Sequence, residues 1–273
     1  MIPQTPKPPQ GRQPAKPTGA LLKRHPSVWL HGAGLSGDTW RAITADLPDA
    51  HTPDLPGHGM APMIDPPRVE GYADALCEAI PQDAVLIGHS LGGMVALELA
   101  ARMPERIAAL ILIEAVPTVR DRLSGHVAGT LATALFSRIP PGWFAALSGI
   151  GHPQATQAEL RRQMRRLDRG QIRAALEAAR HYDGRSRLSL VRAPTLVIVG
   201  EKSGATLHGA TLMAETIPGA RLLKLPGGHM LHTDNPLQLR RAIDGFVRAT
   251  LPEDSGRATI AALPTQNPRP RSQ

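Results

Sequence analysis

The stretch Gly88-His89-Ser90-Leu91-Gly92-Gly93 lies between an apolar run, Ala84 to Ile87, and a helical pattern, Met94 to Arg102. The run predicts a buried strand that leads directly into a helix. A G-x-S-x-G at such a junction is typical of a sharp turn that projects the serine hydroxyl from the sheet edge. Strand and helix nearly collide there, so the positions of Gly88 and Gly92 must be small. The alternative, a serine without a catalytic role in a glycine-rich turn, has less support from this pattern. Ser90 is therefore predicted to be a nucleophile.

Strand-like and helix-like segments alternate on both sides of this turn. The predicted strands are Val28–Leu30, Leu110–Ile113, Thr195–Val199 and Arg221–Leu225, and Pro236 to Leu251 predicts a closing amphipathic helix. Strands that alternate with helices imply a mostly parallel sheet with helices on both faces. We therefore expect one α/β core, formed by residues 25–117 and 191–251.

Residues 118–190 interrupt the alternation with several helical segments. Breaks are expected at Pro140-Pro141-Gly142, His152-Pro153 and Arg169-Gly170. An insertion of this kind between two strands is expected to lie over the carboxyl edge of the sheet, where open α/β sheets bind ligands, and we interpret it as a helical cap.

The predicted cap holds four of the eight aromatic residues of the chain. Phe136 and Tyr182 are expected to form the cap's own small core. Trp143 and Phe144 follow a Pro-Pro-Gly turn, and they either join that core or line a substrate pocket.

The net charge of +8 raises the question of nucleic-acid binding, and its distribution argues against it. The first 24 residues carry five basic side chains and no acid, and residues 118–190 carry twelve arginines against five acids. Four of those arginines, at 161, 162, 165 and 166, are expected to form mainly a solvated helix face. The alternative is that they attract an acidic substrate or carrier protein.

The two ends of the chain differ from its body. Prolines at 3, 6, 8, 9, 14 and 17 predict a disordered tail over residues 1–24, and residues 252–273 look similar. One cysteine, Cys77, excludes an internal disulfide and fits a reducing compartment. No apolar run approaches the ~18 residues of a membrane span, and the start lacks the apolar core of a signal peptide. We expect a cytoplasmic protein that does not bind membranes.

A reactive serine needs donors for the oxyanion that develops on its substrate. One expected donor is the backbone N–H of Leu91, which opens the helix after the turn. The second is the N–H of Ala33, in the glycine-rich loop His31-Gly32-Ala33-Gly34 that follows the first strand. His31 itself is expected mainly to fix this loop by hydrogen bonding, with substrate binding as a weaker alternative.

The serine also needs a base from a late loop at the same sheet edge. Gly227-Gly228-His229 follows the strand Arg221–Leu225 and precedes the last helix, so His229 is the candidate. His232 lies three residues further on and is the alternative.

Three possibilities exist for the acid that orients the base. The usual place lies just after the strand Thr195–Val199, but Ser203 stands where an aspartate would be expected, and Glu201 is nearby. Glu114 ends the strand Leu110–Ile113, which is expected to lie next to the strand before Ser90. An ionisable group at the end of an apolar strand is costly unless paired, which favours Glu114. Its structural alternative is a salt bridge to Arg120, and the third possibility is a dyad without a carboxylate.

Together these motifs resemble the α/β-hydrolase superfamily over roughly residues 25–250. The supporting stretches are 30–40, Asp54-Leu55-Pro56-Gly57-His58-Gly59, the turn at Ser90 and Gly228-His229. The chain is most similar to small carboxylesterases of the pimeloyl-carrier-protein methyl esterase and acyl-homoserine-lactone hydrolase type. The placement of Glu114 resembles the acid of many haloalkane dehalogenases, but Ser90 excludes their aspartate chemistry. The resemblance also implies that the family's first hairpin is truncated or absent.

The leading hypothesis is a hydrolase of a small carboxylic ester, thioester or lactone. Ser90, His229 and Glu114 would form its triad, and Ala33 and Leu91 its oxyanion hole. No cofactor or metal is expected, because the eleven histidines show no ligand spacing such as H-E-x-x-H. A catalytically silent binding protein on the same fold and a hydrolase of carbon–carbon bonds are the alternatives. The sequence does not indicate an oligomeric state.

Overall fold

The computed structural model describes residues 22, 24–120, 143, 146–147, 149–165, 167 and 169–251 of the chain. Six strands form one sheet in the order β2-β1-β3-β4-β5-β6, and every paired neighbour is parallel. Their bounds are Ser27–Leu30 (β1), Ala50–His51 (β2), Ala84–His89 (β3), Ile107–Ile113 (β4), Thr195–Gly200 (β5) and Arg221–Leu225 (β6). The predicted α/β architecture with a parallel sheet is confirmed.

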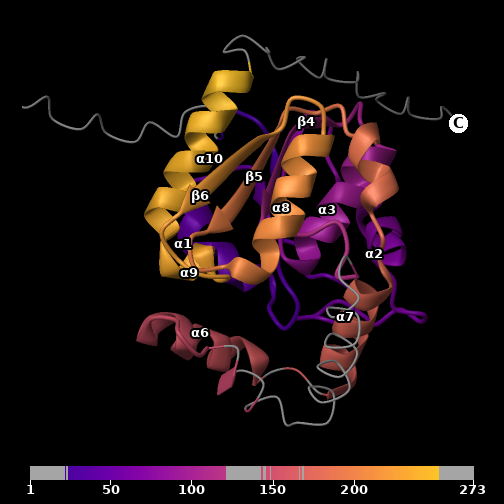
Figure 1. The fold of residues 1–273 in the computed structure, drawn as a ribbon. Coiled ribbons are helices and arrows are strands. Elements are labelled where there is room, and N and C mark those ends of the chain that lie inside the picture. Colours follow the sequence, from indigo (N-terminus) through magenta and orange to yellow (C-terminus); the bar gives the residue numbers. More distant parts are fainter. Residues whose placement is uncertain are drawn as a thin grey trace, which may run out of the picture.

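Helices cover both faces of the sheet (Figure 1). One face carries α2 (Val69–Leu76), α3 (Leu91–Arg102) and α8 (Gly204–Thr216), and the other carries α1 (Arg41–Thr44) and α10 (Pro236–Thr250). The short helix α9 (Leu231–Asp234) precedes α10, and 3-10 turns span Gly37–Trp40, Cys77–Ala79 and Arg185–Leu190.

The central strands supply apolar side chains to both faces in alternation. Leu110 and Leu112 of β4 pack with α2, α3 and α8, whereas Ile111 and Ile113 pack with α1 and α10. A parallel strand buried on both faces is expected to be apolar throughout, and β4 fits this rule. The strand predicted from Leu110–Ile113 therefore lies at the centre of the sheet, between β3 and β5.

Two further helices, α6 (Gln154–Met164) and α7 (Arg169–His181), lie across the carboxyl ends of the strands (Figure 1). Leu160 and Met164 of α6 and Ile172 of α7 pack with Leu35 and Met230, which belong to loops of the sheet. The break predicted at His152-Pro153 is confirmed, because α6 begins at Gln154. The break predicted at Arg169-Gly170 lies slightly earlier in the chain, since α6 ends at Met164 and α7 begins at Arg169. The break at Pro140-Pro141-Gly142 lies outside the described residues.

Two details differ from the sequence-based expectations. Leu22 falls in the tail predicted over residues 1–24, but it is only 1% exposed and packs with Trp29 and Trp40. The ordered core therefore includes a residue before the predicted boundary. Tyr182, assigned to the cap's own core, instead packs in the main core. Its hydroxyl donates to the buried Glu98 of α3 at 3.1 Å, and this hydrogen bond holds Tyr182 in the main core. Within the described ranges, no helix combines the length and the apolar character needed to cross a bilayer.

Candidate functional site

Ser90 occupies a sharp turn between β3 and α3. Its φ of 52° and ψ of −116° are unfavourable for a residue with a side chain, and they turn the chain directly into the helix. A Cβ on Gly88 would lie 2.3 Å from the carbonyl oxygen of Gly92, and one on Gly92 would lie 2.4 Å from that of Leu30. Both contacts are with backbone that cannot move aside, so both positions require glycine. Strand β3 and helix α3 therefore approach each other as closely as the sequence predicts.

The loop between β6 and α9 brings His229 to this serine. His229 Nε2 lies 3.1 Å from Ser90 Oγ, although the residues are 139 positions apart in the sequence. The alternative, His232, is 2% exposed and its Nε2 contacts Thr39 Oγ1 at 2.9 Å. Burial lowers the pKa of His232 to about 3. His232 is therefore a neutral core residue, and His229 is the histidine that faces Ser90.

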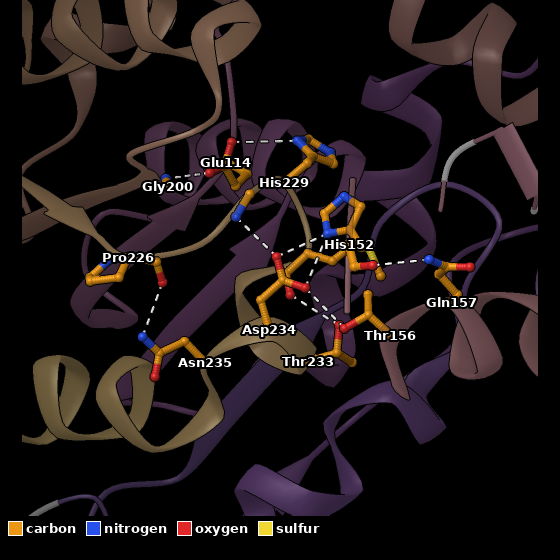
Figure 2. A network of polar contacts seen from close by, with 12 residues as sticks. Glu114, His152, Thr156, Gln157, Gly200, Pro226, His229, Thr233, Asp234 and Asn235 are labelled. Atoms are coloured by element: carbon orange, nitrogen blue, oxygen red, sulfur yellow. Dashed lines mark hydrogen bonds and ion pairs between the residues drawn. The ribbon is translucent and has the colours of Figure 1, made fainter. Parts of the chain in front are cut away.

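Glu114 follows the last residue of β4 and faces the other nitrogen of the same imidazole. Its Oε2 lies 3.4 Å from His229 Nδ1 (Figure 2). The residue has a φ of 51°, and its carboxylate is fully buried. Oε1 accepts a hydrogen bond from the N–H of Gly200, and Oε2 accepts one from Thr206 Oγ1 at 2.5 Å. The Arg120 salt bridge considered as a structural alternative is not among the described contacts of Glu114.

These contacts determine the charge of Glu114. Burial by itself would raise its pKa, but the hydrogen bonds from His229, Thr206 and Gly200, with the adjacent His229 ring, lower the pKa below its usual value. An ionised Glu114 accepts from Nδ1–H and leaves Nε2 as the free acceptor facing the Ser90 hydroxyl. The geometry is that of a nucleophile, a base and an orienting acid in line.

The end of β5 does not supply an acid. Ser203 is 9% exposed, and its hydroxyl has no hydrogen-bond partner among the described residues. Glu201, the other candidate, is exposed to solvent. The structure therefore brings Glu114, rather than Glu201, to His229.

Two buried histidines shape the loop over Ser90. His31 Nδ1 donates to the carbonyl of Gly32 at 2.9 Å, and its Nε2 accepts from the N–H of Leu55 at 2.9 Å. His58 Nε2 accepts from the N–H of Gly34 at 3.3 Å. His31 is 0% exposed, and burial lowers its pKa to about 3. Both ring nitrogens of His31 bond to backbone of nearby loops, which favours the loop-fixing role over the alternative of substrate binding.

The expected oxyanion donors lie in the two segments that meet at Ser90. A Cβ on Gly32 would lie 3.3 Å from Ser90 Cβ, which places the Ala33 loop directly against the nucleophile. Leu91 is the first residue of α3, so its N–H has no partner within the helix. Over the described ranges, neither the Ala33 nor the Leu91 amide donates a hydrogen bond. Both are available to an oxygen near Ser90.

The aromatic residues of the predicted cap do not form a described pocket. Trp143 is 68% exposed, which does not fit the pocket-lining alternative for this residue. Phe144 and Phe136 lie outside the described residues. A cavity of about 380 Å³ adjoins His229 instead, and it is lined by Ile150–His152, Lys202–Thr206 and Gly228.

Some residues that support this arrangement were missed in the sequence analysis. His89 Nε2 donates to the carbonyl of His229 at 2.8 Å and so holds the base loop from the nucleophile side. The sequence signal that could have indicated this role is the position of His89 directly before Ser90. Gly200 and Thr206 lie 86 and 92 positions from Glu114, and no local pattern marks them. Within the ranges that the structure describes, no cluster of three or more histidine, cysteine or carboxylate side chains could hold a metal.

Comparison with known proteins agrees with this site and fold. Residues 28–242 match the model of the Alpha/beta hydrolase family. The pimeloyl-[acyl-carrier protein] methyl ester esterase of Aromatoleum aromaticum is 33% identical over 250 residues, which cover 83% of this chain and 100% of that protein. An esterase of Mycobacterium tuberculosis is 30% identical and covers 82% of each chain.

Solved structures show the same fold. A thermophilic esterase from Thermogutta terrifontis superimposes with a TM-score of 0.71 at 26% identity, over 83% of this chain and 90% of that one. MenH from S. aureus superimposes with a TM-score of 0.73 at 22% identity, over 82% of this chain and 93% of that one, and it supports the fold alone. By its sequence match, its parallel sheet and its strand–serine–helix turn, the chain is a member of the alpha/beta hydrolase family.

Proposed function

We propose that this protein is a serine hydrolase that cleaves a carboxylic ester, thioester or lactone through an acyl-enzyme on Ser90. The observation that carries the proposal is the line of contacts from Ser90 Oγ to His229 Nε2 at 3.1 Å and from His229 Nδ1 to Glu114 Oε2 at 3.4 Å. The named esterases among its relatives support the choice of ester bonds.

The first half of the reaction forms the acyl-enzyme. Ser90 Oγ attacks the substrate carbonyl as its proton moves to His229 Nε2, and Glu114 stabilises the resulting imidazolium. The amides of Ala33 and Leu91 donate to the negative oxygen of the tetrahedral intermediate. That intermediate collapses, the carbon–oxygen or carbon–sulfur bond breaks, and His229 returns the proton to the departing alcohol or thiol.

The second half releases the acid. A water molecule gives its proton to His229 Nε2 and attacks the acyl carbonyl in the same oxyanion hole. Collapse of this second intermediate breaks the bond to Ser90 Oγ, and His229 returns the proton to the serine.

We also propose that residues 118–190 form a cap that selects the acyl group. Leu35 and Met230 flank the predicted oxyanion loop and His229, and they pack with Leu160, Met164 and Ile172 of α6 and α7. This apolar cluster lies beside the site, where an aliphatic acyl chain would be favoured. Pimeloyl methyl ester esterases are among the relatives, so a methyl ester of a medium-length acyl chain is the first substrate to test.

The proposal is tested with a fluorophosphonate probe and a series of p-nitrophenyl esters from acetate to decanoate, beside a homoserine-lactone panel. We expect covalent labelling of the wild type, no labelling of Ser90→Ala, and loss of turnover by about 10³-fold or more in Ser90→Ala and His229→Ala. A folded wild-type protein that neither reacts with the probe nor hydrolyses any ester would instead support the silent binding protein.

A further inference from the structure

Asp234 is a buried carboxylate that the proposed reaction does not use. It is the last residue of α9, five positions after His229, and its side chain is 5% exposed. A carboxylate withdrawn from water is costly unless it is paired and hydrogen-bonded. Its partners therefore indicate what the residue does.

Those partners come from two separate parts of the chain (Figure 2). Asp234 Oδ2 accepts from the N–H of Gly228, the residue directly before His229, at 2.9 Å. The same carboxylate contacts His152 Nδ1 at 2.9 and 3.0 Å through its two oxygens, and Oδ1 accepts from Thr156 Oγ1 at 2.9 Å. His152 precedes α6 and Thr156 lies in its first turn, so one side chain joins α6 to the loop of the candidate base.

The His229 loop is held at its other backbone groups as well. The carbonyl of Pro226 accepts from Asn235 Nδ2 at 3.0 Å, and the carbonyl of His229 accepts from His89 Nε2 at 2.8 Å. Those two contacts come from the base loop's own C-terminal flank and from β3. Met230, directly after His229, packs against Leu160 and Met164 of α6, and among the hydrogen bonds of the described residues to this loop, the one at Gly228 comes from a side chain that also bonds to α6.

The packing at this point leaves little freedom. A Cβ on Gly228 would lie 3.0 Å from His152 Cε1 and 3.5 Å from Asp234 Oδ2. The side-chain amide of Gln157 donates to the carbonyl of His152 at 3.0 Å and fixes its backbone. A shift of α6 would therefore displace Asp234 or leave it with an unpaired charge.

We propose that Asp234 is a positioning residue that sets His229 and α6 in a single arrangement, so that the base is correctly oriented when α6 lies over the site. The inference rests on the proposed hydrolase function. Asp234 acts through the backbone of the His229 loop and does not touch the reacting atoms. His152 and Thr156 transmit the position of α6 to it.

The contact of Asp234 with Gly228 and its contacts with α6 are expected to affect different kinetic parameters. Asp234→Ala removes the acceptor for Gly228, and we expect kcat on p-nitrophenyl acetate to fall by about 10- to 100-fold, the range for losing a charge-assisted hydrogen bond. Asp234→Asn keeps an acceptor oxygen for Gly228, so it should recover most of this loss. His152→Gln and Thr156→Val leave the Gly228 contact in place, so they should change kcat on acetate by less than about threefold and raise KM for a long acyl ester.

The matched control is Asp244→Asn. Asp244 is also buried, at 7% exposed, and it pairs with Arg240 on α10 at 3.0 Å. This variant should lower the melting temperature while kcat stays unchanged. If Asp234→Ala behaves like Asp244→Asn, with reduced stability and intact kcat, Asp234 is only structural and the proposal is overturned.

A second measurement does not depend on turnover. Hydrogen exchange of the peptide covering residues 226–231 should become faster in His152→Gln, because the loop loses its link to α6. In addition, the rise in KM for a long acyl ester that His152→Gln produces should be absent when Asp234→Ala is already present. Unchanged exchange with additive kinetic effects would overturn the inference. An inactive but folded wild type that still shows the exchange change would overturn the hydrolase function and leave the structural link standing.

Discussion

The carboxyl ends of β4 and β5 lie side by side in the sheet, and they differ in what each brings to the proposed site. β4 ends in Glu114, whose carboxylate reaches His229. β5 ends in Gly200, and the hydroxyl of the nearby Ser203 has no hydrogen-bond partner within the part of the chain that the structure describes. The end of β5 does not donate an acid, but its Gly200 amide and the Thr206 hydroxyl both donate to the acid on β4.

The comparison indicates that the proposed acid depends on donors from the neighbouring strand end and from α8, as well as on its own place at the end of β4. A Cβ on Gly200 would lie 3.0 Å from Glu114 Oε1 and 2.7 Å from the carbonyl of Gly227. The lack of a side chain at 200 is therefore part of the Glu114 site. A buried carboxylate without these donors would be protonated and unable to stabilise an imidazolium.

The largest expected effect comes from removing the carboxylate charge of Glu114, which directly follows β4. Glu114→Gln keeps the shape of the side chain but removes the charge that orients and stabilises His229, so kcat should fall by about 10³- to 10⁴-fold. The matched control is Glu201→Gln near the end of β5, which removes an exposed carboxylate and should leave kcat unchanged. Steady-state kinetics on one ester compares the two variants. A large loss of kcat in Glu201→Gln with an intact Glu114→Gln would instead assign the acid to Glu201, after β5.

The second effect tests whether the two strand ends are interchangeable. Ser203 and His229 line the same cavity, so we expect an aspartate at 203 to extend towards the imidazole. Ser203→Asp in the Glu114→Gln background should recover activity by about tenfold or more, equal to roughly 1.4 kcal/mol of transition-state stabilisation. Ser203→Asn in the same background is the uncharged control. Equal activity of the two double variants would show that β5 cannot supply the acid in this protein.

The prediction of Glu114 depended on two facts visible in the sequence. A carboxylate follows an apolar strand, and that strand was expected next to the one before Ser90. Strand order could be inferred because parallel βαβ units place consecutive strands in a small set of ways. What the sequence could not show is Thr206, since its helix is separated from Glu114 by the whole predicted cap.

The helix α8 itself was not predicted, and its composition explains why. It contains Gly209 and several threonines, which are poor helix formers. A Cβ on Gly209 would lie 2.6 Å from Val116 Cγ1, so this glycine allows α8 to approach the chain just after β4. Tertiary packing of this kind overrides local propensity. The contacts of Asp234 with His152 were equally invisible, because they span 82 positions.

An intermediate effect is expected from the hydroxyl of Thr206, in α8, which donates to Glu114 at the end of β4. Thr206→Val preserves the shape of the side chain and removes the donor to Glu114 Oε2, while the Gly200 amide remains. Loss of one hydrogen bond to a charged group should lower kcat by about tenfold and leave KM unchanged. Thr211→Val, which removes a hydroxyl that bonds only to the backbone of α8, is the control. An unchanged kcat in Thr206→Val would mean that Gly200 alone suffices.

The smallest expected effect is in stability towards acid, and it separates the charge of Glu114 from its shape. Burial opposes ionisation of Glu114, but its hydrogen bonds from His229 and Thr206 keep the folded pKa below 4.5. A carboxylate with a lowered pKa stabilises the fold above its unfolded pKa, and this stability is lost as the pH falls through the folded value. Protonation of Glu114 should therefore change the difference in unfolding free energy between wild type and Glu114→Gln below about pH 4.5, in the direction that disfavours the wild type.

The buried His31 and His232 also make stability depend on pH. Because burial lowers the pKa of each to about 3, they take up protons on unfolding between about pH 6.5 and 3, and stability falls as the pH falls through that window. This slope is the same in wild type and Glu114→Gln, so it cancels in the difference, which urea unfolding at half-unit pH steps would measure. A difference that instead shifts in favour of the wild type as the pH falls from 7 towards about 4.5 would mean that Glu114 has a raised pKa and is protonated in the folded protein at neutral pH. In that case β4 would present His229 with a neutral acid, and the distinction drawn between the two strand ends would not hold.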